Sequence, residues 1–207
     1  MSERQGDQTL LDFDIIYQAR RNGLLSPFDE KRLKGASYDL RAGDWVWVVR
    51  SQQDGGYDKL SLKDIGEIII NPGQTVTIYS LERINLSNDM KARISLRSHW
   101  AIKGLYFNGG IVDPGYTGIL FFNVTNLGTS PITIEYGAGL VTIEFVRMDQ
   151  PSQRLYNDGE IITDVPTEKL PPLPEKPPVD LQALQSHLLE LENKLLLYEK
   201  KLAQEGK

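Results

Sequence analysis

Cysteine is absent from this chain, histidine is scarce, and long apolar runs are missing. Without cysteine there can be no disulfide bond and no thiolate metal site, and the zinc deaminase chemistry that depends on His and Cys ligands is excluded. His99 and His187 are too few for a multi-histidine metal site within one chain. No apolar run reaches the roughly 18 residues that span a bilayer, and Met1–Gln8 lacks the apolar segment of a signal peptide. We therefore expect a cytoplasmic protein without a metal site of its own.

An excess of basic charge is missing as well. The 207 residues carry 23 Lys and Arg against 28 Asp and Glu, which gives a net charge of −5. A mildly acidic chain without a basic run does not favour binding to the phosphates of a nucleic acid. Any anionic ligand would therefore have to be held by local donors. The length is sufficient for one domain with a sizeable core and an appendage.

The middle of the sequence contains a series of short strands. Before them, residues 10–22 have the spacing of an amphipathic helix that Gly23 is suited to end. From residue 37 to 147, apolar and polar residues alternate in short runs separated by turn residues, which indicates an all-β barrel or jelly roll. Spacing alone does not choose between these two. Trp45 and Trp47 are interpreted as core or interface packing. The clearest alternating runs are 45–50, 75–80, 132–136 and 141–146.

The sequence after residue 150 has a different character. Six prolines lie between Pro166 and Pro178, so residues 151–179 are expected to form a stiff, extended linker. In residues 180–205, apolar residues recur at alternating spacings of three and four, which is the a/d pattern of a coiled coil. This helix either self-associates or packs on its own domain, and the proline linker favours self-association. Residues 1–9 are expected to be disordered and residues 10–150 to form the β domain.

Four segments of the β domain carry a resemblance to a known superfamily. In the same order, they resemble conserved motifs of the dCTP deaminases and dUTP diphosphatases, and dCTP deaminase-like proteins are the most similar group. The resemblance implies a mainly β fold, a distorted jelly-roll barrel of the dUTPase-like β-clip type, here with an N-terminal helix and a C-terminal coiled-coil helix. It also implies a homotrimer with active sites between subunits. The four segments are Gly35–Gly43, Ala92–Ser98, Gly110–Gly118 and Gly137–Phe145.

The resemblance implies roles for individual residues. Arg97 is placed to grip phosphate oxygens through its planar guanidinium, and Ser98 to donate a hydrogen bond to a phosphate oxygen. Asp113 is placed like the carboxylate that contacts the sugar 3′-hydroxyl and, in dUTPases, orients or deprotonates the attacking water. Tyr116 is placed like the aromatic residue that packs on the deoxyribose. Mg²⁺ would accompany the triphosphate and neutralise its charge. Taken alone, Asp113–Tyr116 is also an ordinary turn sequence.

Some positions depart from the family pattern. The deaminases resemble one another in a Glu that moves a proton between water and the cytosine ring, and Asn123 stands at that position here. An amide cannot act as a general acid or base near neutral pH, so dCTP deamination is expected to be impaired. The dUTPases do not use that Glu, and Asn108 resembles the Asn with which their hairpin reads uracil. Asn108 and Asn123 are therefore both nucleotide-binding candidates. Against a dUTPase, Thr142 replaces a Gln, and the linker and heptads replace a glycine-rich C-terminal arm.

Three functional hypotheses follow. The first is a trimer that handles deoxynucleoside triphosphates and hydrolyses dUTP to dUMP and pyrophosphate, with Asp113 as the catalytic residue. The second is a dCTP deaminase with an unusual proton carrier. The third is a catalytically inactive trimer that senses a nucleotide or acts as a scaffold, with a protein partner on residues 180–205. The sequence leaves open whether the chain is an enzyme, and it predicts neither nucleic acid nor membrane as a partner.

Overall fold

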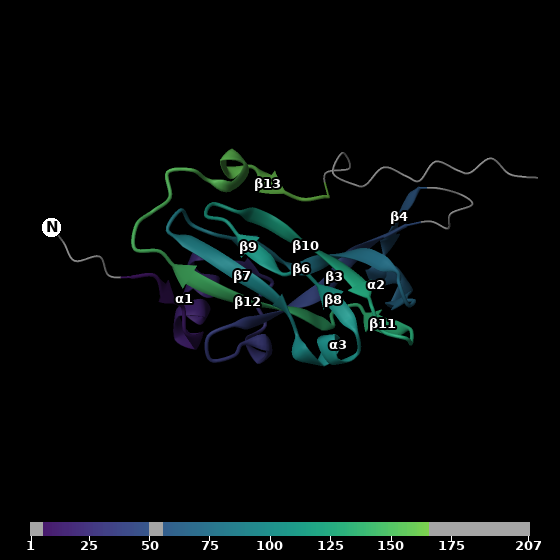
Figure 1. Ribbon diagram of the computed structural model, residues 1–207. Helices are drawn as coiled ribbons and strands as arrows, with labels where there is room; N and C mark the ends of the chain where they lie inside the picture. The colour runs from purple at the N-terminus through teal and green to yellow at the C-terminus, as the bar shows by residue number, and fades with distance from the viewer. Residues whose placement is uncertain (1–5, 50–55, 166–207) are drawn as a thin grey trace, which may run out of the picture. The chain divides into compact units, whose positions relative to one another are not determined.

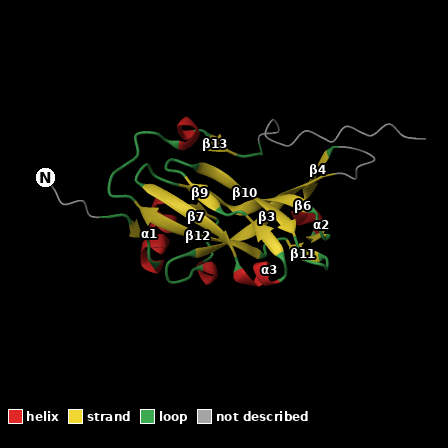
Figure 2. Cartoon of the chain, in the orientation of Figure 1, coloured by secondary structure: helices red, strands yellow, loops and turns green. Residues whose placement is uncertain are grey.

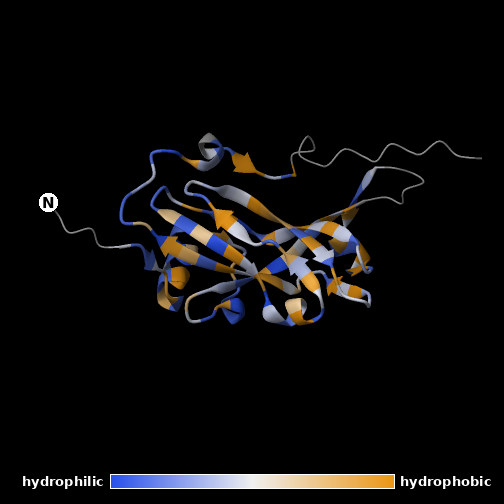
Figure 3. Cartoon of the chain, viewed as in Figure 1, coloured by the Kyte–Doolittle hydropathy of each residue, from blue (hydrophilic) through white to orange (hydrophobic). Residues whose placement is uncertain are grey.

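Strands with one buried face make up most of the computed structural model, which describes residues 6–49 and 56–165 (Figure 1, Figure 2). In the strand β12 (Gly139–Arg147), Val141, Ile143 and Phe145 are fully buried whereas Glu144 is exposed. Successive side chains of a strand point to opposite faces, so this alternation packs one face against the core. Figure 3 shows the corresponding hydrophilic and hydrophobic bands along β7. The mainly β class expected from the sequence is confirmed.

The order of elements is dominated by strands. The four alternating runs noted in the sequence fall in β3, β6, β11 and β12. The strands are β1 (Gln8–Thr9), β2 (Leu25–Ser26), β3 (Tyr38–Val49), β4 (Tyr57–Ser61), β5 (Glu67–Ile70), β6 (Thr75–Asn85), β7 (Met90–Leu96), β8 (Leu105–Phe107), β9 (Gly110–Val112), β10 (Thr117–Asn126), β11 (Ile132–Glu135), β12 (Gly139–Arg147) and β13 (Ile161–Ile162). The helices are α1 (Asp12–Asn22), α2 (Leu62–Ile65) and α3 (Ser98–Ile102), and the single 3₁₀ turns are η1 (Glu30–Arg32) and η2 (Tyr156–Gly159).

An 11-stranded sheet organises the described residues (Figure 1). Its main path runs β13-β10-β6-β3-β12-β7-β9, while β1, β2, β4 and β8 pair with β12, β6, β3 and β10 respectively. A separate two-stranded sheet joins β11 and β5. Every pairing is antiparallel except that of β13 with β10. The architecture is thus a curled, mainly antiparallel sheet, which agrees with the coarse fold expected from the sequence.

The inward faces of these strands form one apolar core that contains few polar side chains. Tyr38, Phe122 and Phe145 are among its largest fully buried members. Glu82 on β6 is also completely buried, and it accepts hydrogen bonds from Tyr38 Oη (3.3 Å), Arg41 Nε (2.5 Å) and the Arg41 main-chain N (2.9 Å). A buried carboxylate is tolerated only when it is paired and hydrogen-bonded. Glu82 and Arg41 therefore fix β6 against β3 beneath the candidate site.

The N-terminal helix begins two residues later than the spacing of its apolar residues predicts. Leu10 is buried, and its main-chain N donates to Phe145 O (2.8 Å), so the chain remains extended there and extends the pairing of β1 with β12. Ile15 faces the core as expected, but Leu11 at the N-cap is 46% exposed. Gly23 ends the helix at φ 65°, a left-handed conformation that glycine adopts at little cost.

The residues after β12 continue along the sheet as far as Val165. The sequence assigns residues 151–165 to the linker, whereas the structure places β13 beside β10, with Thr117 opposite Ile161 and Gly118 opposite Ile162. The prolines from Pro166 onward and the heptads of residues 180–205 lie outside the described residues. None of the helices that the structure describes is long and apolar enough to cross a membrane.

Candidate functional site

A row of polar side chains crosses β3, β12 and β7 on the face of the sheet that turns away from the core. Thr142 lies opposite Asp39 on one side and opposite Ser95 on the other. Thr142 Oγ1 donates to Asp39 Oδ1 (2.9 Å), and Arg97, two residues beyond Ser95, contacts the second oxygen of Asp39 through Nε (3.2 Å). Lys34 Nζ lies 3.6 Å from the same oxygen. The carboxylate of Asp39 is therefore nearly buried, and it orients Arg97, the residue predicted to bind phosphate.

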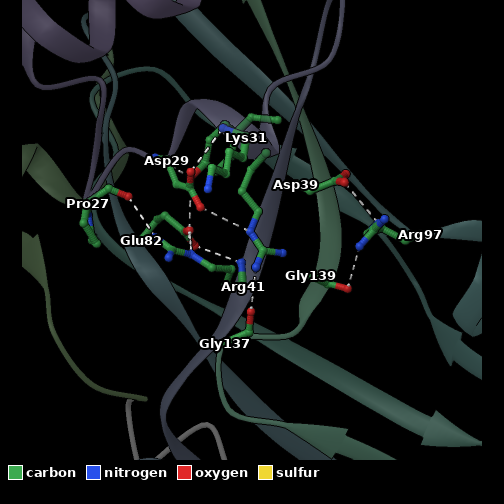
Figure 4. A network of polar contacts seen from close by, with 11 residues as sticks. Pro27, Asp29, Lys31, Asp39, Arg41, Glu82, Arg97, Gly137 and Gly139 are labelled. Carbon is green, nitrogen blue, oxygen red and sulfur yellow. Dashed lines mark hydrogen bonds and ion pairs between the residues drawn. The ribbon is translucent and has the colours of Figure 1, made fainter.

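The guanidinium of Arg97 is held by a second contact as well. Its Nη1 donates to the main-chain oxygen of Gly139 (3.2 Å), as Figure 4 shows beside the contact to Asp39. A methyl group on Gly139 would collide with this guanidinium, and it would also crowd Arg32. The glycine at the start of β12 therefore leaves room for the guanidinium in this position. The side chain of Arg97 remains 29% exposed, so a planar, oriented cation is still available to an anion.

Ser98 follows directly and begins the short helix α3 with its side chain exposed. Trp100 anchors this helix, because its ring is buried and its Nε1 donates to Gly139 O (2.9 Å), the same oxygen that Arg97 uses. The Lys103 ammonium lies 4.7 Å from the Trp100 ring centroid. Burial and the charges of Arg97 and Lys103 lower the pKa of His99, which keeps its imidazole neutral near pH 7. The predicted pair Arg97–Ser98 thus sits on a rigid turn.

A cleft of about 600 Å³ lies next to this polar row. Its floor is the outward face of β7 and β12, and the segment that links β8 to β9 forms a wall. Arg93 and Glu144 face each other across these two strands, and neither has an ion-pair partner within the described residues. The cleft therefore offers a cation and an anion to a ligand. It is lined by Ser37, Arg93, Ile94, Ser95, Leu96, Phe107, Asn108, Gly109, Gly110, Ile111, Thr142 and Glu144.

Asn108 lies on the wall of this cleft, in the segment that connects β8 to β9. The sequence suggested a hairpin here, but the described pairings join β8 to β10 and β9 to β7 instead. Val124 on β10 pairs with Phe107, the last residue of β8, and Asn123 immediately precedes Val124. Asn123 Oδ1 accepts a hydrogen bond from Thr77 Oγ1 (2.6 Å) and the side chain is exposed. Asn108 thus lines the cleft, whereas Asn123 is not among the residues that line it.

Asp113, in contrast, lies far from Arg97 within one chain. It follows β9, whose Val112 pairs with Ala92 near the start of β7, whereas Arg97 comes after the end of β7. The two residues are therefore separated by about six strand positions, or roughly 20 Å. Asp113 is exposed, and its side chain has no hydrogen-bond or ion-pair partner within the described residues. A site that uses both groups needs a second copy of the chain.

Tyr116 is placed differently from an open sugar platform. Its side chain is only 6% exposed, and its hydroxyl donates to the main-chain oxygen of Ile119. Tyr156, from the segment that follows β12, lies against it at 5.1 Å between ring centroids. Burial, together with Tyr156, raises the pKa of Tyr116 well above that of free tyrosine, so the phenol remains neutral. No sequence pattern predicted that residues after 150 would cover this ring.

The structure also adds residues that the sequence did not single out as site residues. Asp39 contacts Arg97 and Thr142, and Arg93 and Glu144 line the cleft. Alternation within β7 and β12 places these side chains outward, but only the pairing of the two strands shows that they share one cleft. Within residues 6–49 and 56–165, no group of three or more His, Cys, Asp or Glu side chains could hold a metal ion.

Comparison with known proteins gives a consistent result. Residues 11–148 match the family model described as dCTP deaminase-like. A dCTP deaminase of Thermococcus kodakarensis is 34% identical over 140 residues, which covers 68% of this chain and 86% of the relative. A relative from Mycolicibacterium gilvum, named dCTP deaminase, dUMP-forming, is 26% identical over 162 residues, 72% of this chain and 85% of the relative. The crystal structure of 2′-deoxycytidine 5′-triphosphate deaminase from Agrobacterium tumefaciens is similar in fold, with a TM-score of 0.57 at 20% identity over 69% of this chain and 49% of that chain.

Proposed function

The chain belongs to the dCTP deaminase-like family, and from this premise we propose that it is a homotrimer that hydrolyses dUTP to dUMP and pyrophosphate. The observation that carries the proposal is the seating of Arg97, whose guanidinium Asp39 and Gly139 orient beside Ser98. A planar, oriented guanidinium beside a hydroxyl is well suited to bind the oxygens of a triphosphate. The amide of Asn123 stands where the deaminases have their proton-carrying Glu, which favours hydrolysis over deamination. The name of the Mycolicibacterium gilvum relative shows that dUMP is a product within this family.

In the proposed reaction Asp113 accepts a proton from a water molecule. The oxygen of that water bonds to the α-phosphorus while the bond from this phosphorus to the bridging oxygen breaks, and pyrophosphate leaves with the electron pair. Arg97 and Ser98 hold phosphate oxygens in line for this displacement. Asn108 and Asn123 contact the base, and Tyr116 packs on the deoxyribose after Tyr156 moves from its ring. Each of these residues acts by position and charge.

Mg²⁺ is expected to bind with the triphosphate. Asp39 already interacts with Arg97, Lys34 and Thr142, and the described part of the chain holds no cluster of metal ligands. The phosphate oxygens would therefore supply most of the ligands. When bound, the ion would supply positive charge that neutralises the phosphates.

Three copies would assemble this site. Because Asp113 and Arg97 lie at opposite ends of β7, the proposal combines Arg97 and Ser98 of one copy with Asp113 of another. In a closed trimer with threefold symmetry, each of the three sites would receive the same residues from two neighbouring copies. The jelly-roll barrel, the linker of residues 166–179 and a trimeric coiled coil over residues 180–205 complete the proposed assembly.

The experiment that tests the function is pyrophosphate release by the purified full-length chain, with dUTP, dCTP and the other deoxynucleoside triphosphates. We expect release from dUTP that requires Mg²⁺ and stops when the ion is chelated. Asp113→Asn should lower the rate by about 10²- to 10⁴-fold, the usual contribution of a general base. The matched control is Asp64→Asn on α2, an exposed carboxylate for which the described residues show no side-chain partner. Release of ammonia from dCTP, with none of pyrophosphate from dUTP, would contradict the proposal.

A catalytically inactive nucleotide sensor or scaffold is the second candidate. The observation that favours it is the contact of Tyr156 with Tyr116, which covers the ring expected to receive the sugar. A sensor would show saturable stabilisation by a deoxynucleoside triphosphate without turnover, because a ligand that binds only the folded state raises its apparent stability. A scaffold would show neither effect and would act through residues 180–205.

A further inference from the structure

A cluster of aromatic side chains lies outside the candidate site, on the outward face of β3, β4 and β6. Trp45 is 40% exposed, and Trp47 is partly exposed, so neither belongs to the core, which is one of the two roles that the sequence suggested for them. Trp47 lies opposite Lys59 on β4 and opposite Thr77 on β6. Tyr79, two residues beyond Thr77, therefore shares their face of the sheet.

The ammonium group of Lys59 sits among three of these rings. Its Nζ is 5.0 Å from the ring centroid of Trp45, 5.9 Å from that of Trp47 and 5.2 Å from that of Tyr79. Each distance is within the roughly 6 Å at which the electron-rich face of an aromatic ring attracts a cation. The side chain of Lys59 is 27% exposed, so water screens this attraction only in part.

A carboxylate completes the environment of the ammonium. Lys59 Nζ donates to Asp164 Oδ2 (2.6 Å), and Tyr79 Oη donates to the other oxygen of Asp164. Tyr79 Oη in turn accepts hydrogen bonds from Trp47 Nε1 (2.7 Å) and from the main-chain N of Val165 (3.3 Å). Burial opposes the charged form of Asp164, but the hydrogen bonds from Lys59 and Tyr79 outweigh it and lower the pKa of this carboxyl. The carboxyl group of Asp164 therefore remains ionised near neutral pH.

From this geometry we propose that Trp45, Trp47, Tyr79 and Asp164 form a recognition site for an alkylammonium group. Lys59 of the same chain occupies it and thereby fastens the segment that ends at Val165 to the sheet. Aromatic rings around an ammonium, with a carboxylate at hydrogen-bond distance, provide both cation–π attraction and a charge-assisted hydrogen bond. None of these groups is needed to bind a nucleotide or to activate water, so this site is independent of the proposed hydrolysis.

Fastening at this point has a direct structural effect. Asp164 and Val165 lie at the end of the described residues, two positions after β13, and their other contacts with the sheet come from the short pairing of β13 with β10. A two-residue strand provides few hydrogen bonds, so most of the attachment at its C-terminal end depends on Lys59 and Tyr79. The site thus determines how firmly residues 161–165 are held to the sheet.

The test removes the resident ammonium and then supplies one from solution. Lys59→Ala in the full-length chain should increase amide hydrogen exchange of residues 161–165 by roughly threefold to thirtyfold, which corresponds to loss of one partly exposed cation–π site. Added n-butylammonium should reverse the change in a saturable manner, whereas NaCl at the same ionic strength should not. Lys59→Arg should retain most of the protection, because a guanidinium also binds aromatic faces.

Two further variants decide whether the aromatic rings are responsible. Lys63→Ala, an exposed lysine on α2, is the matched control and should leave exchange unchanged. The double variant Trp45→Ala, Lys59→Ala should no longer respond to n-butylammonium. Unchanged exchange in Lys59→Ala would overturn the proposal, and so would rescue by n-butylammonium that persists without Trp45. Circular dichroism of each variant separates a local effect from failure to fold.

Discussion

Glu82 illustrates how a single residue can control the region beneath a site. Its carboxylate is fully buried and receives three hydrogen bonds, two from Arg41 and one from Tyr38 (Figure 4 shows its contacts with Arg41). Arg41 Nη2 also donates to Pro27 O (3.1 Å), so the network reaches the turn after β2. Burial disfavours the cation of Arg41, but the hydrogen bond and charge of Glu82 reverse this effect and raise its pKa.

Removal of this carboxylate should be costly. Glu82→Ala leaves the guanidinium of Arg41 without its anion, and we expect a loss of about 3–5 kcal/mol in the free energy of unfolding. Urea unfolding followed by circular dichroism measures the change. Glu67→Ala, at an exposed position of β5, should remain within about 0.5 kcal/mol of the parent. A loss in Glu82→Ala no larger than that of the control would show that the network adds little stability.

Tyr38 should make the stability depend on alkaline pH. Burial and the nearby charge of Glu82 raise the pKa of Tyr38 from 10.0 to about 12. A group whose pKa is higher in the folded state contributes stability that is fully present below its unfolded pKa and is lost as pH rises through the folded one. We therefore expect the free energy of unfolding to fall between about pH 10 and pH 12, by roughly 2–3 kcal/mol.

Urea unfolding at a series of pH values, with phenolate absorbance as a second probe, measures this dependence. Tyr38→Phe loses the hydrogen bonds of the hydroxyl and should be less stable at pH 8, but its alkaline decline should be smaller. A decline of the same size in Tyr38→Phe would assign the effect to other tyrosines.

Gly139 should be required for phosphate binding. Alanine there would displace the guanidinium of Arg97 from its contacts with Asp39 and Gly139 O. We expect affinity for a deoxynucleoside triphosphate to fall at least about tenfold, because a misplaced bidentate donor costs a charge-assisted hydrogen bond. Isothermal titration calorimetry measures the affinity, with Gly35→Ala, where a methyl group meets open space, as the control. Equal affinities for the two variants would show that Arg97 does not need the space at Gly139 to bind the nucleotide.

At the level of single residues, sequence motifs suggested Arg97 and Ser98 as phosphate-binding candidates. They did not suggest the residues that orient the side chain of Arg97. Arg97 and Ser98 were identified from a local motif. Asp39, Thr142 and Gly139 meet Arg97 only because β3, β12 and β7 are neighbours in the sheet. Local spacing contains no information on which strands pair, so these partners could not be derived from it.

Among the elements, β13 can pair with β10 only because residue 118 of β10 is a glycine. Gly118 on β10 has φ 148°, and an added methyl group would collide with the main-chain oxygen of Ile162 on β13. Gly118→Ala should therefore detach β13 and lower the free energy of unfolding by about 1–3 kcal/mol, the usual cost of backbone strain. Amide hydrogen exchange should accelerate in residues 161–165 and much less in β6. Protection of β13 equal to that of the parent would contradict this dependence.

Elements were predicted well where they carry a long alternating pattern. β3, β6 and β12 expose one face and bury the other, and the sequence showed this directly. β13 was not predicted because two residues form no pattern, and its partner β10 runs parallel to it. The hairpin at Asn108 was also not formed as expected, because β8 and β9 find better partners in β10 and β7. Tertiary pairing determined both outcomes.

For the whole molecule, the separation of Asp113 and Arg97 leads to a complementation experiment. If each site takes Arg97 from one copy and Asp113 from another, two inactive variants can restore activity together. We expect Arg97→Ala and Asp113→Asn, unfolded and refolded as an equimolar mixture, to regain about a quarter of the parental rate, since a quarter of the sites would contain both native residues. Refolding of either variant alone should give none. No recovery from a mixture shown to contain mixed trimers would place both residues in one copy.

The long strand β3 carries Asp39 near one end and Trp45 and Trp47 toward the other. Between its pairings of Ala42 with Ser80 and Val46 with Ile78, β3 contains four steps where β6 contains two. The surplus is an even number, so Tyr38, Leu40, Ala42 and Val46 all remain buried. Loss of a single residue here would invert one half of the strand, turning the tryptophans inward and core side chains outward. An insertion or deletion in β3 should therefore be tolerated only in pairs of residues, because the side chains of the cleft and the tryptophans at the other end share one strand.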